Sequence, residues 1–453
     1  MSSGSVCPVC LTPIPAAHET VGDETFLVKT CPDHGEFRTV VWRGEPSFSS
    51  WARDKVPSGP KTPFTSVDKG CPLDCGLCEA HRQHTCTALI EVTWRCDLGC
   101  PVCFASSGAK ASPDPSPDDI GRLFDRVEQA SGFCNIQLSG GEPTVREDLP
   151  DLIRMGKDKG FPFIQLNTNG LRLAREKGYA QRLAEAGLDS VFLQFDGTDD
   201  RIYQVLRGRP LFADKLAALD ALAQAGVGVI LVPTVVPGVN DHDLGNILRL
   251  AVDRSPVVRG VHFQPVSYFG RYPSPPGDQE RITLPEIMRG LETQTSGLLR
   301  ASDFSPPGCE HAYCSFHANY VVTEAGGLTR LSAGGKCGCA PRPASEGADA
   351  AKSFVKRQWS GPGRELPMDF GQPAEAGPAD ELDAFIRRAA THTLAVSAMA
   401  FQDCWTLDLD RLKGCCIHEV SPDGRLIPFC AYNLTSMDGE TLYRGKCDGI
   451  AVP

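Results

Sequence analysis

Residues 88 to about 270 alternate between short strand-like apolar runs and longer helical runs. Apolar runs of about four to eight residues that are bounded by turn residues are typical of buried strands. Strands are predicted at Ala88–Thr93, Asn135–Leu138, Phe163–Asn167, Ser190–Phe195, Gly228–Val235 and Gly260–Pro265. Helices are predicted at Asp118–Ser131, Arg146–Lys159, Leu173–Ala186, Asp200–Leu206, Ala213–Ala225 and Asp241–Ser255. This alternation predicts an α/β fold with a parallel sheet, whose chemistry lies at the carboxyl ends of the strands.

Other regions flank this sheet, which we assign to residues 88–290. Residues 1–65 form a small cysteine-bearing head with little apolar core of its own, and a metal ion would supply the missing stability. Residues 66–87 carry a second group of cysteines, and residues 291–453 a further one. Between the cysteines of this last region, residues 340–380 are rich in Pro, Gly, Ala and charge. They are predicted to form a flexible loop.

Length and charge restrict the class of protein. A chain of 453 residues exceeds the size at which a single core stops growing, so several units are expected. Its net charge of −11 argues against a nucleic-acid partner, because neutralising phosphates needs a basic surface. The sequence has no uninterrupted apolar span of about 20 residues, so no transmembrane segment is predicted. No secretory signal is visible at the N-terminus, which predicts a cytoplasmic location.

The 20 cysteines fall in short C-x2-C and C-x3-C-x2-C groups, which favours metal binding over disulfides. The most informative group is Cys96, Cys100 and Cys103, which directly follows the first predicted strand. Three thiolates at this spacing can hold three irons of a [4Fe–4S] cluster and leave the fourth iron open to a small molecule. A zinc knuckle is the alternative for a short cysteine triplet.

This triplet, followed by Phe104, resembles the signature of the radical S-adenosylmethionine (SAM) superfamily. The resemblance implies that SAM binds the open iron. Its reductive cleavage then gives a 5′-deoxyadenosyl radical, which abstracts hydrogen from unactivated carbon. A low-potential reductant such as flavodoxin or ferredoxin is implied as a partner. The predicted strands, each with a crossover helix, match the open, partial (β/α)6 barrel of that superfamily.

Polar motifs end the later strands of the predicted barrel. Gly140, Gly141 and Glu142 resemble the superfamily's GGE motif, in which an exposed backbone binds the methionyl ammonium. The other candidates for cofactor binding are Asn167, Asn169, Gln194, Asp196 and Gln264. Taken singly, each is a weak signal: Asn167 and Asn169 also suit an ordinary strand-to-helix turn, and Asp196 can contact ribose or substrate or cap a helix. Their recurrence at successive strand ends favours a binding site.

Three further metal sites are predicted. Cys7, Cys10, Cys31 and His34 suit one mononuclear zinc or iron ion, although His34 alone could be a surface turn residue. The second set, read as a [4Fe–4S] cluster with zinc as the alternative, is Cys71, Cys75, Cys78 and Cys86. The third set is Cys309, Cys314, Cys415 and Cys430, where spacing does not decide between Cys415 and Cys416. The remaining thiols are interpreted as small buried hydrophobes, with Cys337, Cys339 or Cys404 as alternative ligands.

The motifs CPVC…CPDHG, CPLDCGLC, CDLGCPVCF, QLSGGEPT, QFDG and CCIHEVSPDGRLIPFCAYN occur in this order. Together they resemble the archaeal tetraether lipid synthase family, a group also described as pterin-methylating radical SAM enzymes. The resemblance implies three [4Fe–4S] clusters, a rubredoxin-like mononuclear site and C–C bond formation between lipid hydrocarbon chains, a substrate compatible with peripheral membrane contact. Two alternatives stay open: radical methylation of a pterin-like or other small molecule, and a non-catalytic zinc or iron–sulfur scaffold.

Overall fold

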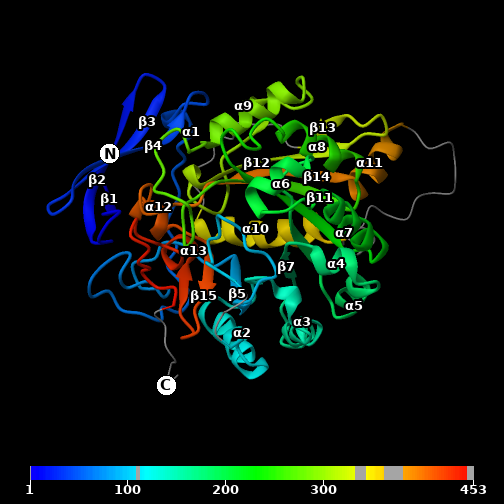
Figure 1. Cartoon of the computed structure of the whole chain (residues 1–453), viewed down its shortest axis with the longest axis horizontal. Coiled ribbons are helices and arrows are strands. Elements are labelled where there is room, and N and C mark those ends of the chain that lie inside the picture. The colour runs from blue at the N-terminus through cyan, green and yellow to red at the C-terminus, as the bar shows by residue number, and fades with distance from the viewer. Residues whose placement is uncertain (1, 109–112, 332–342, 362–380, 446–453) are drawn as a thin grey trace.

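The computed structural model describes residues 2–108, 113–331, 343–361 and 381–445 (Figure 1). The head is an antiparallel sheet of neighbouring strands β1 (Ser2–Val6), β2 (Pro13–Val21), β3 (Glu24–Cys31) and β4 (Gly35–Arg43). A short helix α1 (Phe48–Trp51) follows. Trp42 and Trp51 belong to the main hydrophobic core, so the head is packed onto the rest of the chain.

The centre of the molecule is a parallel sheet in the order β5-β6-β7-β8-β9-β11. Its strands are β5 (Thr87–Thr93), β6 (Asn135–Gly140), β7 (Ile164–Thr168), β8 (Ser190–Gln194), β9 (Gly228–Val232) and β11 (Val258–Pro265). A short β10 (Thr234–Val235) follows β9 and pairs with β11. These elements match the predicted strands, and the prediction of a partial radical SAM-type barrel is confirmed.

Helices connect these strands and cover the outer face of the sheet. They are α2 (Pro117–Ser131), α3 (Leu149–Asp158), α4 (Leu171–Arg175), α5 (Tyr179–Glu185), α6 (Asp200–Arg207), α7 (Phe212–Gln224) and α8 (Leu244–Asp253). In helix α2, Ser116 and Asp119 form a capping box and the apolar residues are buried. These local features explain why the sequence pattern predicted this helix. The helix predicted at 173–186 is two helices, since Gly178 adopts a φ of 78° between them.

C-terminal strands extend the barrel sheet at both edges, which the sequence analysis did not predict. Strand β14 (Thr393–Met399) pairs in parallel with β11, and β12 (Ser315–Val322) and β13 (Leu328–Arg330) follow it as antiparallel neighbours. At the other edge, β15 (Ile417–Val420) pairs in parallel with β5, and β16 (Leu426–Pro428) lies outside it. The short helices α12 (Leu409–Lys413) and α13 (Phe429–Tyr432) flank this edge. Helices α9 (Leu284–Gln294) and α11 (Glu381–Thr391) complete the fold.

The loop prediction for residues 340–380 is wrong for residues 344–359, because Ala344–Trp359 form helix α10. Its alanines favour a helix. A glycine at 347 lets the helix backbone pass close to Gly308, because a Cβ there would lie 2.3 Å from the Gly308 carbonyl oxygen. The helix contacts β6, β9, β11 and β14, and Figure 1 shows it in yellow across the middle of the molecule. Residues 340–342 and 362–380 of the predicted loop lie outside the described residues.

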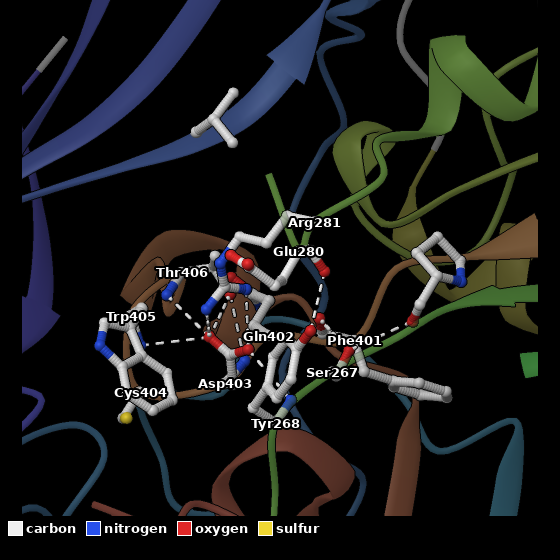
Figure 2. A network of polar contacts seen from close by, with 12 residues as sticks. Ser267, Tyr268, Glu280, Arg281, Phe401, Gln402, Asp403, Cys404, Trp405 and Thr406 are labelled. Atoms are coloured by element: carbon white, nitrogen blue, oxygen red, sulfur yellow. Dashed lines mark hydrogen bonds and ion pairs between the residues drawn. The ribbon is translucent and has the colours of Figure 1, made fainter. Parts of the chain in front are cut away.

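A buried ion pair joins the barrel to the C-terminal segment (Figure 2). The Arg281 guanidinium donates to Asp403 at 2.9 Å, and the backbone N–H groups of Tyr268 and Trp405 donate to the same carboxylate. Next to this pair, the Lys29 ammonium from the head donates to the Cys404 carbonyl at 2.7 Å. Head, barrel and C-terminal segment therefore meet at one polar junction. None of the helices in the described ranges has the length and apolar character needed to span a bilayer.

We expect Asp403→Asn to lower the free energy of unfolding by roughly 3–5 kcal/mol, because it leaves the Arg281 charge buried without its partner. Asp410→Asn is the matched control, since Asp410 pairs with Arg82 at the surface, where the loss should stay below about 1 kcal/mol. Denaturant unfolding of both variants measures the difference. Equal losses would contradict this role of the junction.

Candidate functional site

One cavity of about 780 Å³ is lined by the strands of the barrel sheet, by β12 and β14 and by helix α10. Nearly all residues predicted from the sequence to bind SAM and its cluster reach it. They are Cys96, Cys100, Cys103, Phe104, Gly140, Gly141, Glu142, Asn167, Asn169, Gln194 and Gln264. The strand-end prediction therefore brings together residues that are up to 168 positions apart, from 96 to 264, around one space.

The cysteine loop that follows β5 is held by Arg271. Backbone hydrogen bonds run in both directions between Arg271 and Cys103, and the guanidinium donates to the carbonyl oxygens of Cys100 and Ser107 at 3.0 and 3.1 Å. Burial raises the pKa of the Cys96 thiol to about 12. Ionising this thiol needs a nearby positive charge, which a bound iron supplies. The loop is therefore fixed through its backbone, while its three thiols face the cavity and fit an iron–sulfur cluster.

The two glycines at the end of β6 are required by close backbone packing. A Cβ at Gly140 would lie 2.1 Å from the Thr93 oxygen, and one at Gly141 would lie 2.1 Å from the Arg95 oxygen, just before Cys96. The buried Glu142 carboxylate then accepts hydrogen bonds from Thr168 Oγ1 and from the backbone N–H of Asn169, both at 2.6 Å. The GGE motif thus joins the ends of β5, β6 and β7 around the cysteine loop.

Asp196 is the predicted site residue that does not line the cavity. It is fully buried, and its carboxylate oxygens accept two hydrogen bonds of 2.7 Å from the Arg207 guanidinium. Arg207 does line the cavity. The carboxylate therefore holds Arg207 in place, and a ribose, substrate or helix-cap role for Asp196 stays a prediction. The sequence offered no signal for Arg207, since a charge within an amphipathic helix is usually exposed.

Lys215 is a second buried cation that the sequence did not reveal. Its ammonium donates to the Asn169 carbonyl at 2.5 Å and to Gln194 Oε1 at 3.4 Å. Burial lowers the pKa of this ammonium to about 8. Lys215 therefore positions two of the predicted cofactor-binding residues from behind the cavity wall.

The four predicted ligands of the head converge. The ligand atoms of Cys7, Cys10, Cys31 and His34 lie within 4.8 Å of one another, and His34 Nδ1 is 3.6 and 3.4 Å from the sulfurs of Cys7 and Cys31. A tetrahedral zinc ion with sulfur bonds of about 2.3 Å places its ligands about 3.8 Å apart. This arrangement fits a mononuclear metal ion.

The grouping predicted for the other cysteines is wrong in one respect. The sulfurs of Cys86, Cys309 and Cys416 lie within 4.8 Å of one another, so Cys86 is separated from the preceding C-x3-C-x2-C group. The cause is the pairing of β15 with β5, in which Ile417 is opposite Thr87 and the Cys86 N–H donates to the Cys416 carbonyl at 2.9 Å. Cys416, rather than Cys415, joins Cys309, and it is not the small apolar filler that the sequence suggested.

Cys415 precedes β15 and, unlike Cys416, does not line the cavity. Burial, and after it the neighbouring thiols of Cys430 and Cys314, raise the pKa of Cys415, so these three predicted ligands remain near one another. Cys71 and Cys75 also interact directly, whereas Cys404 is buried beside Lys29. Cys337, Cys339 and Cys447 lie outside the described residues.

Cys86, Cys309 and Cys416 also line the cavity that contains Cys96, Cys100 and Cys103. Two groups of three thiols, from different parts of the chain, therefore face one space. A molecule in this cavity can be reached from both groups. This arrangement suits a reaction in which a cofactor bound at one group acts on a substrate held near the other.

Two family models match the chain. The model of the Radical SAM superfamily matches residues 90–251, which contain the cysteine loop and most of the barrel. The model of the HMPTM N-terminal zinc ribbon domain matches residues 2–43, which form the head.

Individual proteins are also similar. The chain is 34% identical to the 7,8-dihydro-6-hydroxymethylpterin dimethyltransferase of Methanocaldococcus jannaschii, over 95% of this chain and 92% of that protein. It is 32% identical to the mitochondrial GTP 3′,8-cyclase of Arabidopsis thaliana, over 39% of this chain and 45% of that protein. Among solved structures, Streptococcus suis SuiB bound to its precursor peptide SuiA matches with a TM-score of 0.40 and 15% identity, over 48% of this chain and 46% of that one.

Gly141→Ala is expected to abolish SAM cleavage, because the added Cβ would displace the backbone at Arg95 and with it the cysteine loop. Gly99→Ala is the control on the same loop, since a Cβ there meets nothing within 4 Å. The measurement is 5′-deoxyadenosine formation by the reduced, iron-reconstituted protein. Full activity of the Gly141 variant would show that this close approach is not needed.

We predict that Cys86→Ala, Cys309→Ala and Cys416→Ala each remove the same bound metal, because the three thiols converge. If that metal is a [4Fe–4S] cluster, each variant loses about four iron and four sulfide ions per chain. Cys134→Ala is the control, since Cys134 is buried but outside these groups. Iron, zinc and sulfide analysis gives the result, and an unchanged metal content in the Cys416 variant would refute the grouping.

Proposed function

Because this chain belongs to the radical SAM superfamily, and within it to the family of the 7,8-dihydro-6-hydroxymethylpterin dimethyltransferase, we propose that it is a radical SAM C-methyltransferase acting on a pterin-like ring. The observation that carries the proposal is the 34% identity over 95% of the chain, which includes the head, the barrel and the C-terminal cysteines. The similarity to GTP 3′,8-cyclases, in contrast, covers less than half of the chain.

The residues around the cavity fit the cofactor of the superfamily. SAM, bound at a cluster on Cys96, Cys100 and Cys103 and cleaved after one-electron reduction, supplies a 5′-deoxyadenosyl radical that abstracts hydrogen from carbon. The backbone of Gly140 and Gly141 offers polar groups beside these thiols, and Arg207 offers a positive charge that suits a carboxylate. The electron requires a low-potential donor, such as flavodoxin or ferredoxin.

The lining of the cavity is mainly apolar, but polar groups interrupt it at several positions, and these suit a substrate that carries heteroatoms. Inward-facing positions of the barrel strands are often filled by branched apolar residues. Here Gln137, Ser139, Asn167 and His262, together with Ser397 of β14, line the cavity. Asn167 Oδ1 has no hydrogen-bond partner in the part of the chain that the structure describes, so a lipid chain would leave this acceptor unsatisfied, at a cost in binding free energy. Apolar residues such as Phe269 and Phe429 line other parts of the wall and exclude water.

The size of the cavity supports the same choice. About 780 Å³ is within the range of sites for small molecules, and it must accommodate part of SAM as well as the substrate. Coupling of two lipid chains, which the sequence motifs suggested, would require a long apolar groove in addition. Methylation of a ring is therefore the function that the geometry supports best.

The proposal is tested with anaerobically reconstituted, reduced enzyme. The enzyme is incubated with SAM, a reduced one-carbon folate as a second methyl source, and either 7,8-dihydro-6-hydroxymethylpterin or an archaeal diether lipid. The expected result is a methylated pterin with concurrent 5′-deoxyadenosine, detected by mass spectrometry. A coupled lipid together with an unmodified pterin would overturn the proposal, and intact SAM under these conditions would contradict radical chemistry altogether.

The two cysteine groups should be separable by mutation. We expect Cys96→Ala to abolish 5′-deoxyadenosine formation, because one iron of the cluster loses its ligand. Cys309→Ala should retain SAM cleavage and lose product formation, since Cys309 reaches the cavity from the other group. Measuring both products in both variants checks this division, and equal loss of the two activities in the Cys309 variant would refute it.

A further inference from the structure

The part of the cavity formed by the C-terminal extension of the sheet has a composition of its own. It is lined by Phe192 of β8, His262 of β11, Asn319 of β12, Ser397 of β14 and Trp359 of α10. We call these residues the extension subsite. The cysteine loop and the GGE motif follow β5 and β6, whereas Phe192 and His262 precede the SAM candidates Gln194 and Gln264 by two residues on β8 and β11. The subsite therefore lies away from the cysteine loop and borders the SAM candidates of β8 and β11.

Aromatic rings form the apolar part of the extension subsite. The centroid of the Phe192 ring is 5.7 Å from that of His262, with an interplanar angle of 28°, and 5.1 Å from that of Trp359, with an angle of 49°. Such ring surfaces favour stacking with another flat π-system. The backbone of Trp359 packs closely on β9, because a Cβ at Gly228 would lie 2.3 Å from the Trp359 carbonyl oxygen. The aromatic side chains of the subsite can therefore stack on a planar ligand.

The extension subsite also contains buried polar atoms that have no hydrogen-bond partner within the described ranges. Asn319 Oδ1, an acceptor, and Trp359 Nε1, a donor, are buried and have no hydrogen-bond partner among the described residues. A buried polar group in a native protein normally has a partner, so each calls for one from a ligand. An N–H on the ligand satisfies the asparagine, and a ring nitrogen or carbonyl oxygen satisfies the indole.

His262 adds an uncharged group that can serve in either role. Its Nδ1 lies 2.9 Å from Ser397 Oγ, and burial lowers the pKa of the imidazole to about 4, so the ring is neutral at physiological pH. With Nδ1 beside Ser397 and one ring face against Phe192, Nε2 is the polar atom of the ring that remains for a ligand. A neutral imidazole suits an uncharged heterocycle better than an anion, because it carries no charge to pair.

We propose that the extension subsite recognises the flat, nitrogen-rich ring of the substrate by stacking and by hydrogen bonds to a donor and an acceptor on its edge. The inference rests on the proposed methylation of a pterin-like ring and adds the residues that select it. A hydrocarbon chain can neither donate to Asn319 nor accept from Trp359, so the same groups discriminate against lipids.

The test measures binding of 7,8-dihydro-6-hydroxymethylpterin to the reconstituted holoenzyme by anaerobic equilibrium dialysis. Asn319→Leu removes the acceptor at similar volume, and Trp359→Phe removes the indole N–H but keeps an aromatic ring. We expect the Kd for the pterin to rise about tenfold in the first variant and about threefold to tenfold in the second. Trp405→Phe is the matched control, because Trp405 packs in another cluster away from the cavity, and it should bind like the wild type.

SAM binding to the same preparations reports whether each variant is folded. If Asn319→Leu loses SAM binding, the pterin affinity of the milder variant Trp359→Phe decides whether the subsite binds the ring. Wild-type affinity for the pterin in both folded variants would overturn the subsite and leave the proposed function intact. A wild-type enzyme that binds the pterin but does not methylate it would overturn the proposed function and leave the subsite standing. Absence of pterin binding by the wild type would overturn both.

Discussion

Strand β5 and its two parallel neighbours are the constraint on which the site depends. Its carboxyl end leads into the cysteine loop, and the end of β6 packs against it so closely that only glycines fit at 140 and 141. Its amino end is paired with β15, which places Cys416 beside Cys86. One strand thus has a group of converging thiols at each end, and both groups line the same cavity. Backbone pairing, which depends little on side-chain identity, sets this spacing.

Buried charges hold the parts of the cavity wall in register. Asp196 and Arg207 form a pair behind the SAM region, and Asp403 and Arg281 form another where the C-terminal segment meets the barrel. Pairs of this kind contribute little net stability, but leaving one charge alone is costly. These pairs therefore select one arrangement of the helices and strands, in which every buried charge has its partner, and add little to the overall stability. In Figure 2, Asp403 is contacted from several segments at once, and the neighbouring Ser267 hydroxyl donates to the Phe401 carbonyl, both residues of the cavity wall.

The polarity of the barrel interior connects structure with function. Amides, hydroxyls and an imidazole line the interior of the barrel. Apolar residues at the same positions would make the protein more stable if their only role were to fill the core. Asn167, Asn319 and Trp359 each keep an unpartnered buried polar atom. Buried polar atoms without partners lower the stability of the ligand-free protein. They are expected where a ligand supplies the missing hydrogen-bond partners. Helix α10 closes this interior, so the polar face of the sheet and the apolar face of the helix together shape the substrate space.

The sequence by itself determined the barrel and the location of its chemistry, because the period of apolar residues and the spacing within C-x3-C-x2-C, GGE and C-x2-C are local properties. It also singled out the four residues of the head whose ligand atoms converge, because they belong to two short motifs at the β1–β2 and β3–β4 turns. Only the tertiary structure decided the partners of Cys86, the choice of Cys416 over Cys415, the pairing of Asp196 with Arg207 and the position of α10 in the wall of the cavity. Each of these depends on contacts between segments far apart in the chain, such as residues 86 and 416. No local sequence pattern encodes such contacts, since they form when the C-terminal strands pair with the edges of the barrel sheet.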